Sequence, residues 1–585
     1  MSVRIAVTLF ALGAVLPFPL AAQENNLQEI IPIDDPVYAY LDLVYLESGL
    51  AQPSAFRPYS AKEFLEYVER VQASRLSRRG RDLLELVKER IRPDILSSQD
   101  GRFGFASSLE TSLEYYAKRE SHSDYIFTRR DRLPIATIPL ELWFFDSAYA
   151  NSTFVLEEDY RLSAGRWEDV SYARGEGSVR PVHGNRFNWF SAEANVLELD
   201  WYFPFRALVA VGRWNWHMSY GRDYLNVGNG TTGNLFLSDY PDYYDSMILS
   251  THWRFFKGTA AYIYFEPWLT ADDRQRLDSG EYYTRIRDYD LPYKAMMIHQ
   301  LEFRPLVNFP DLPQLGIFAA EGIMFGTQYP QIRDFNPMMI FHNWFEYERT
   351  NDTFYLGFNL VPVPRIELYG QYHMNEFDTA YEGGGNFPGA SGWLGGVRGM
   401  LATEAGIFSA YTEYVLTDPL LYNRYHPLLK ITTRRRIWSY VEPDQFIYVD
   451  KPIGYYTGPD TELVSAGVGY RLPPQVEARV AYSSITKGEK NLDSPYEETP
   501  GEETPTGTPW ISHVVEAHAD YTPVPIVSIG GSLYLVWDRN AGHTPGADGF
   551  DVQGRIDVTL RLGNGELAAT REALGRSEER RVGKE

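Results

Sequence analysis

Hydrophobic and polar side chains alternate along most of the chain after residue 103. The alternation is clearest between residues 351 and 377, where two arms flank a break at Val361-Pro362-Val363-Pro364. One face of the two arms carries Phe354, Leu356, Phe358, Leu360, Ile366, Leu368, Gly370 and Tyr372. The other face carries Tyr355, Gly357, Asn359, Arg365, Glu367, Tyr369 and Gln371. Each arm has about ten residues, the length with which a tilted strand crosses a bilayer. The pattern predicts a transmembrane hairpin with a lipid face and a wet face.

The same period of two recurs to the end of the chain and predicts about eighteen strands, an even number as in bacterial outer-membrane barrels. The expected strands are 103–117, 135–147, 151–162, 188–203, 206–214, 246–255, 259–267, 294–304, 315–325, 352–361, 365–374, 392–402, 406–416, 461–472, 475–486, 511–521, 526–537 and 549–562. Short Pro/Gly turns alternate with long loops between them. We therefore expect a mainly β fold, a transmembrane antiparallel β-barrel over residues 99–565. A soluble sandwich or propeller explains the alternating connection lengths less well.

A different period precedes the strands. Residues 23–98 show helical spacing, with a helix over 37–48, a capping box at Ser60-Ala61-Lys62-Glu63 and a third helix from about Ser77 to Pro93. Since short turns face the periplasm in such barrels, this segment is expected to be a small periplasmic helical unit at the barrel mouth.

The two ends of the sequence call for separate treatment. Residues 1–22 combine a positive start, a short apolar run and a small-residue site, which predicts a signal peptide and an exported protein. The tail 576–585, RSEERRVGKE, reads as the translation of a sequencing adaptor and is excluded from fold reasoning as an artefact. The expected location is the outer membrane of a diderm (Gram-negative-type) bacterium.

Composition agrees with a barrel and narrows the function. Aromatic residues make up 15% of the chain, which suits aromatic girdles at the two membrane interfaces. Cysteine is absent, which removes thiol chemistry, and the net charge of -23 argues against nucleic acid as a partner. We expect no cofactor and no metal, lipopolysaccharide and outer-membrane lipid as neighbours, and a monomeric protein.

Two regions of the expected outward loops suggest binding chemistry. The first, residues 239–245, mixes carboxylates with Tyr240, Tyr243 and Tyr244, the groups that stack on and hydrogen-bond to sugar rings. The second, residues 422–436, is a basic patch that can attract an acidic polymer. Its candidate polysaccharide-binding residues are Tyr422, Arg424, Lys430, Arg434, Arg435 and Arg436. The alternatives are an aromatic girdle for the first region, and a lipopolysaccharide-facing rim or lumen charge for the second.

Motifs for catalysis are weak. Residues 228–233 fit GxGxxG but lie in a long loop without the strand and helix of a dinucleotide fold. His513 and His518 in HVVEAH fall on opposite faces of one strand, so they do not share a metal. We expect a protein that is not an enzyme, although a barrel hydrolase with a dispersed site is not excluded by spacing.

Several stretches resemble a known family. They are Gly212-Arg213 through Asp239, Asp334–Pro337, Leu368–Gln371 with Glu376-Phe377, and Tyr411–Tyr414 followed by Asp418-Pro419 and Tyr422. In order and spacing they resemble the Wzi family of outer-membrane capsule-assembly proteins. The resemblance implies an eighteen-stranded barrel with a periplasmic helical bundle and a role as a surface lectin that holds capsular polysaccharide. It assigns no individual contact residues.

The leading hypothesis is accordingly an outer-membrane barrel that binds or organises capsular or exopolysaccharide at the cell surface, without catalysis. The alternative is a porin-like diffusion channel for small solutes, because a barrel with this many strands can leave an aqueous lumen.

Overall fold

The computed structural model describes residues 27–91, 96–97, 102–119, 125, 133–145, 147–158, 186–187, 199–202, 206–241, 243–279, 293–327, 336, 350–376, 390–438, 446–496 and 503–563. The expected signal peptide and adaptor-derived tail lie outside these residues. The helices are α2 (Val37–Ser48), α3 (Ala61–Glu69), α4 (Arg78–Arg90) and α6 (Ala271–Ser279). None of these helices is long and apolar enough to span a bilayer.

The strands of the barrel are β2 (Leu96–Ser97), β3 (Phe103–Ser107), β4 (Leu109–Lys118), β5 (Ala136–Phe144), β6 (Ala148–Glu158), β7 (Arg186–Phe187), β8 (Leu199–Tyr202), β9 (Ala207–Arg213), β10 (Trp216–Asp223), β12 (Tyr244–His252), β13 (Phe256–Phe265), β14 (Tyr293–Phe303), β15 (Gln314–Thr327), β16 (Thr350–Val363), β17 (Ile366–Glu376), β18 (Ala390–Thr403), β19 (Gly406–Thr417), β22 (Thr461–Leu472), β23 (Val476–Lys487), β24 (Trp510–Val524), β25 (Val527–Arg539) and β26 (Gly549–Leu562). Two small sheets lie apart from it, β1 (Phe56–Arg57) with β11 (Asn226–Val227) and β20 (Thr432–Trp438) with β21 (Phe446–Pro452).

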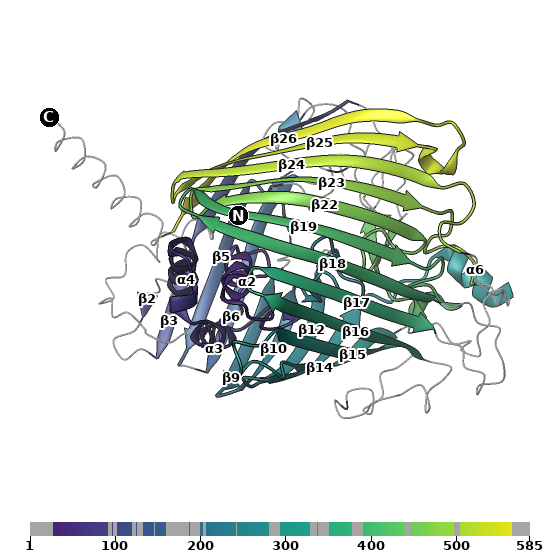
Figure 1. Cartoon of the computed structure of the whole chain (residues 1–585). Coiled ribbons are helices and arrows are strands. Elements are labelled where there is room, and N and C mark those ends of the chain that lie inside the picture. Colours follow the sequence, from purple (N-terminus) through teal and green to yellow (C-terminus); the bar gives the residue numbers. More distant parts are fainter. Residues whose placement is uncertain are drawn as a thin grey trace.

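The strands close into one antiparallel barrel, in which β26 returns to pair with β4 (Figure 1). Taking β3 with β4 and β8 with β9 as single interrupted strands, the described residues form eighteen long strands. Among the described residues each long strand pairs with a neighbour on both sides, as hydrocarbon requires of backbone N–H and C=O groups. The predicted barrel is therefore confirmed.

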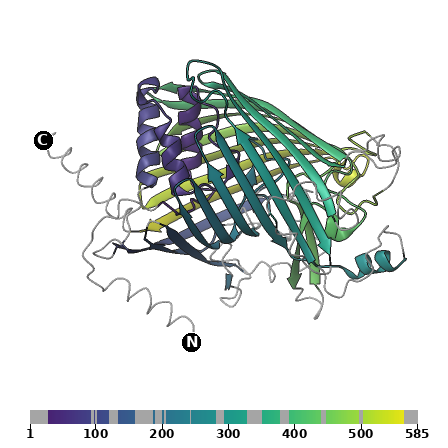
Figure 2. The same cartoon turned by 90° about the horizontal axis from the view of Figure 1, so that it is seen from below.

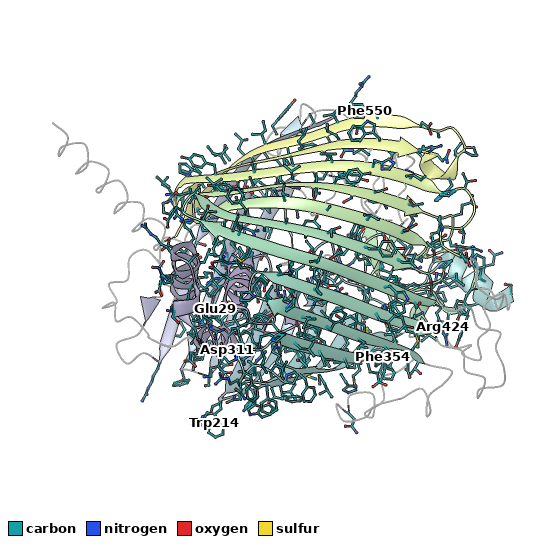
Figure 3. All side chains as sticks on the ribbon, viewed as in Figure 1. Glu29, Trp214, Asp311, Phe354, Arg424 and Phe550 are labelled. Atoms are coloured by element: carbon teal, nitrogen blue, oxygen red, sulfur yellow. The ribbon has the colours of Figure 1, made fainter. Side chains whose placement is uncertain are left out.

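The two faces of the barrel follow the predicted alternation. On β16, Phe354, Leu356 and Phe358 are exposed toward the membrane, whereas Tyr355 and Asn359 point inward and are fully buried. The last strand repeats this arrangement, with Phe550 and Ile556 exposed outside and Gln553 buried inside. Figure 3 shows the outward side chains over the whole wall.

One part of the predicted strand order is wrong. Residues 216–223, assigned to a long loop, form strand β10, which pairs with β9 through the two-residue turn Trp214-Asn215. Within the predicted strand 188–203, the structure describes only β8, which pairs with β6 just as β9 does. The prediction treated Pro204 as a turn, but the break there lies within one strand. The two errors cancel in the strand count.

The N-terminal helices form where the sequence predicts them. The Ser60 side chain accepts from the Glu63 N–H, and the Glu63 carboxylate accepts from the Ser60 N–H, so the predicted capping box is present at α3. Helix α2 ends at Gly49, whose φ of 78° is the left-handed conformation that glycine adopts without a side-chain clash.

The helical unit sits at the short-turn end of the barrel (Figure 2), the periplasmic end in such proteins. Glu47 pairs with Arg365 at the β16–β17 turn at 2.9 Å, and Arg75 pairs with Asp311 before β15 at 2.5 Å. Its apolar core continues into the wall through Val361, Met400 and Ile407. The helices and the wall thus share one core.

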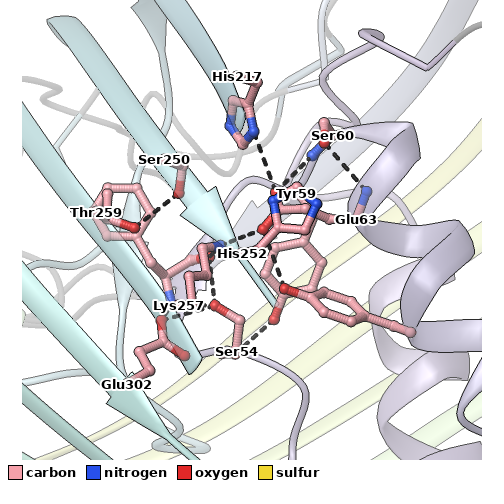
Figure 4. Close-up of polar contacts among 12 residues, drawn as sticks. Ser54, Tyr59, Ser60, Glu63, His217, Ser250, His252, Lys257, Thr259 and Glu302 are labelled. Carbon is pink, nitrogen blue, oxygen red and sulfur yellow. Dashed lines mark hydrogen bonds and ion pairs between the residues drawn. The ribbon is translucent and has the colours of Figure 1, made fainter. Parts of the chain in front are cut away.

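A buried polar network fastens α3 and the strap that precedes it to the wall (Figure 4). The strap is residues 50–59. Lys257 on β13 lies 2.6 Å from the Glu63 carboxylate, and both side chains are buried. Glu302 on β14 accepts from the Ser54 hydroxyl at 2.9 Å. Burial by itself would raise the pKa of Glu63, but the Lys257 ammonium and the nearby imidazoles hold it well below its usual value.

We expect Glu63→Gln to loosen the helical unit, because it leaves the Lys257 ammonium buried without its counter-charge. Breaking a buried pair of this kind costs about 3–5 kcal/mol. The readout is protease sensitivity of residues 27–91 in detergent-solubilised barrel. The control is Glu85→Gln on α4, whose pair with Lys88 is exposed and whose loss costs less than about 0.5 kcal/mol. Equal protection of the two variants would contradict the role given to Glu63.

Candidate functional site

The connection between β10 and β12 does not project outward. Its residues 224–243, here called the inner loop, turn into the lumen, and its β11 pairs with β1 of the strap. The Gly228 N–H also donates to the Ala55 carbonyl at 3.0 Å. A loop from the outer end and a strap from the periplasmic end therefore meet inside the barrel.

Hydrogen bonds from the wall fix the tip of the inner loop. The Glu413 carboxylate accepts from the N–H groups of Thr231 and Thr232, at 2.7 and 2.9 Å. The Gln371 amide donates to Asn234 at 2.6 Å and accepts from the Leu235 N–H at 3.0 Å. The GxGxxG stretch is thus an ordered loop, and among the described residues no helix follows it before β12 as a dinucleotide fold would require. A Cβ on Gly228 would lie 2.1 Å from the Asn234 oxygen, which explains glycine there.

An apolar core surrounds the inner loop. Lumen-facing side chains of β12 to β16 pack against the loop and against the strap residue Phe56. The wall contributes Ile248, Ile263, Met296, Phe318 and Tyr355, and the loop contributes Leu225, Val227, Phe236 and Leu237. All of these side chains are buried. Among the described residues, this half of the lumen is filled like a protein interior along β12 to β16.

Tyr243 lies between two arginines at the outer end. The guanidinium carbons of Arg222 and Arg435 lie 3.7 and 3.8 Å from the centre of its ring. At such distances the two planar groups must occupy opposite faces of the ring. The Tyr243 hydroxyl donates to Glu266 at 3.1 Å, and burial raises the pKa of Tyr243 to about 12. Tyr243 was predicted to stack on sugar rings, but cations cover both faces of its ring. Its contacts with Arg222, Arg435 and Glu266 join loops at the outer end.

Tyr244 and Tyr422 lie in the filled half of the lumen. Tyr244 faces inward on β12 and its hydroxyl donates to the Ser238 carbonyl at 2.7 Å. The Tyr422 hydroxyl donates to the Leu235 carbonyl at 2.7 Å and accepts from the Tyr455 N–H at 2.9 Å. Both side chains are buried. They hold the inner loop and the β19–β22 connection together.

The basic residues of the second predicted region are distributed over several sites. Lys430 is buried and donates to the Leu492 carbonyl at 2.5 Å, and burial lowers the pKa of Lys430. Arg424 is also buried, with its guanidinium over the rings of Tyr425 and Tyr496 at 4.8 and 5.7 Å.

Arg434 joins three outer segments. It pairs with Asp450 on β21 at 2.5 Å, with Asp273 on α6, and donates to the Trp268 carbonyl at 3.2 Å. Its neighbour Arg435 lies 3.6 Å from Glu266. Arg436 pairs through its backbone with Tyr448, and its side chain is outside the described part. The charges of this region act largely within the protein.

A half-exposed patch remains at the outer end of the inner loop, and we call it the outer patch: Tyr240, Tyr456 and Lys451. The rings of Tyr240 and Tyr456 lie 6.3 Å apart with a tilt of 55°, and the Lys451 ammonium lies 5.4 Å from the Tyr240 ring. Sequence reasoning identified Tyr240 and missed the other two. The Tyr455-Tyr456 pair next to Gly454 was the available signal, but the long β19–β22 connection hid its proximity to Tyr240.

Among the residues that the structure describes, no three His, Asp or Glu side chains lie close enough together to hold one metal ion. In HVVEAH, His513 bonds to Tyr482 on the outer face and His518 bonds to Ser532 on the inner face. The predicted separation of the two histidines is confirmed.

Comparison with known proteins yields a fold and no family. No family model matches the chain, and no match emerges among curated proteins. The structure is similar to Wzi of Escherichia coli, a carbohydrate-binding β-barrel involved in group 1 capsule assembly, with a TM-score of 0.54 at 12% identity over 91% of this chain and 99% of Wzi. OccD3 (OpdP) of Pseudomonas aeruginosa matches with a TM-score of 0.39 at 8% identity, over 79% of this chain and 91% of that one. The outer-membrane channel DcaP of Acinetobacter baumannii matches with a TM-score of 0.32 at 7% identity, over 80% and 99%.

The closed barrel and its lipid-facing belt define the class of protein. The chain is an integral β-barrel protein of the outer membrane. Among the solved structures named above, only the likeness to Wzi exceeds a TM-score of 0.5, and at this identity it speaks for the fold.

We expect Arg434→Gln to destabilise the outer end, because Asp273 and Asp450 lose their common partner while both stay largely buried. The cost of such a loss is about 3–5 kcal/mol. Protease sensitivity of the α6 and β20–β21 regions in intact cells is the measurement. Arg539→Gln serves as the control, since that side chain is exposed at the same end. Unchanged protection in Arg434→Gln would contradict this assignment.

Proposed function

We propose that this outer-membrane barrel binds or organises polysaccharide at the cell surface and does so without catalysing a reaction. The observation that carries the proposal is the outer patch. Two half-exposed tyrosine rings, one with Lys451 over a face and the other packed on Tyr455 at 4.9 Å, leave ring surface for sugars and place a cation for hydroxyl or carboxylate oxygens beside it.

The filled half of the lumen favours a binding surface at the outer end of the barrel rather than an open channel entrance there. The inner loop, the strap and the β12–β16 wall form one core, and the loop is bonded to Glu413 and Gln371. A ligand at the outer end therefore meets a floor of ordered protein. A rigid floor lowers the entropic cost of holding a flexible polymer.

The similarity to Wzi supports the same proposal at the level of the fold. That protein is a carbohydrate-binding barrel of similar fold, and membership of its family is part of our proposal for this chain. The glycan contacts are assigned from this chain's own residues, because 12% identity carries no residue roles across.

A mutational test of glycan binding should use the residues of the outer patch rather than the buried basic residues. Replacing Lys430 and Arg434 removes buried structural contacts, so loss of binding in such variants would have two explanations. Tyr240, Tyr456 and Lys451 are half-exposed and sit at the surface of the same loops. Their truncation tests binding with less disturbance of the fold.

We expect Tyr240→Ala/Tyr456→Ala to weaken binding of the host's extracted surface polysaccharide about tenfold or more, the loss that follows from removing two aromatic contacts. The measurement is surface plasmon resonance on protein in lipid nanodiscs. Tyr521→Ala is the matched control, an exposed tyrosine near the periplasmic turns. If wild type binds none of this polysaccharide, the proposal fails; if all three proteins bind equally, the outer patch is not the site.

A further inference from the structure

The lumen has a second half that differs from the filled one. Along β23 to β26 and β4 the inward side chains toward the periplasmic end are mostly polar or charged, and several of them are accessible to solvent. Arg479 and Glu477 on β23 are 43% and 41% exposed, and Asp520 on β24 is also exposed. Inward-facing exposed charges in a closed barrel mean that water reaches this part of the lumen.

The charges on this wall form layers across the strands. Nearest the short turns lies the exposed pair Arg561–Glu110, and further in Glu477, Asp520, Asp557 and Glu114 follow one another in register. One step further from the periplasmic end, Arg479, His518 and Arg555 occupy the next register position. The acidic layer therefore lies at the periplasmic side of the basic layer.

On β24 exposure falls toward the cell exterior, from the exposed Asp520 through His518 at 26% to Glu516 at 17%. On β26 and β4, Arg555 is 21% exposed while Asp557 and Glu114 are buried. Tyr116, Tyr125, Val514, Tyr534 and Val536 form a buried cluster that we call the seal. It begins at Tyr116, the register partner of Arg555, passes Tyr534 opposite Glu516, and extends to Val514 and Val536 on the exterior side. The Tyr125 ring stacks on Tyr534 at 5.6 Å, and its N–H donates to Gln553 on β26 at 2.7 Å.

We propose that this polar wall lines a periplasm-facing compartment for small hydrophilic solutes and ions, and that the seal closes it toward the exterior. The proposed glycan site lies in other loops, so this second function stands independently of the first. In this arrangement a solute passes the Arg561–Glu110 pair, then the acidic layer and the basic layer, and reaches the seal. The exposed Glu477 and Asp520 of the acidic layer favour cations over anions, since carboxylates that line a lumen concentrate counter-ions.

Cysteine labelling tests the compartment directly, because the chain contains no cysteine. Ser532 lies two residues to the periplasmic side of Tyr534 on β25, and Ser512 lies two residues to the outer side of Val514 on β24 and is 6% exposed. We expect Ser532→Cys to react with a membrane-impermeant maleimide in detergent-solubilised, folded barrel and Ser512→Cys to react much more slowly. Equal labelling of both, or none at Ser532→Cys, would overturn the proposal.

Electrical recording tests passage. In planar bilayers we expect little current through wild type and a clear increase in conductance for Tyr534→Ala/Val536→Gly. Tyr355→Ala, which opens space in the filled half, is the control and should conduct like wild type. Folding of each variant is checked by its heat-modifiable mobility in electrophoresis. A folded seal variant that conducts no more than wild type, or a control that conducts equally well, overturns the assignment.

Ion selectivity tests whether the acidic layer sets the charge preference of the compartment. Current through the seal variant should favour potassium over chloride. Adding Asp520→Asn and Glu477→Gln should reduce that preference severalfold because the polar wall loses two exposed carboxylates. A preference that stays unchanged after these substitutions would remove the acidic layer from the proposal. Neither result depends on whether the outer patch binds polysaccharide.

Discussion

Every backbone N–H and C=O group that lies in hydrocarbon must be satisfied within the protein, and this constraint decides the architecture. Here β26 meets β4 over ten register positions from Gln553 to Leu562, so the sheet has no free edge in the membrane. Closing eighteen strands has a consequence inside, because a ring of this size encloses more space than its own side chains fill. The strap and the inner loop occupy much of that space, and they do so from opposite ends of the barrel.

The meeting of strap and loop links the two sides of the membrane. The β1–β11 pairing joins Phe56 to Val227, and the strap continues into α3, where Glu63 binds Lys257 on the wall. On the outer side the same loop leads to Tyr240 and to Tyr243, which Arg222 and Arg435 enclose. A continuous run of packed and hydrogen-bonded residues thus extends from the helical unit to the outer patch. Its rigidity suits a protein that presents a fixed surface to a polymer.

Local patterns in the sequence predicted the strands of the barrel wall. The candidate site was harder to predict because it depends on contacts between residues far apart in the sequence. Alternation is a local signal, so the faces of 352–361, 365–374 and 549–562 followed directly, as did the capping box at Ser60. Strand β10 was missed although Trp216, Met218 and Tyr220 alternate with polar residues, because the two-residue turn before it, Trp214-Asn215, contains neither Pro nor Gly. The burial of Lys430 and Arg434 had no local signal, since their partners Leu492, Asp273 and Asp450 lie in other segments or across a hairpin. The apolar Leu235-Phe236-Leu237 in an outward loop was the one sequence sign that this loop turns inward.

Filling the lumen on one side only has a functional meaning. If the core around Phe236 served only to stabilise the barrel, the wall from β23 to β4 would be expected to pack a comparable core against its inward residues. Instead it carries Arg479, Glu516, His518 and Arg555, charges that cost free energy in an interior unless water or partners reach them. The large apolar side chains on this wall gather in the seal, which begins at Tyr116 beside Arg555 and ends at Val514 and Val536. A wall with exposed charges on the periplasmic side of such a cluster is better suited to admitting solutes from the periplasm than to structural packing.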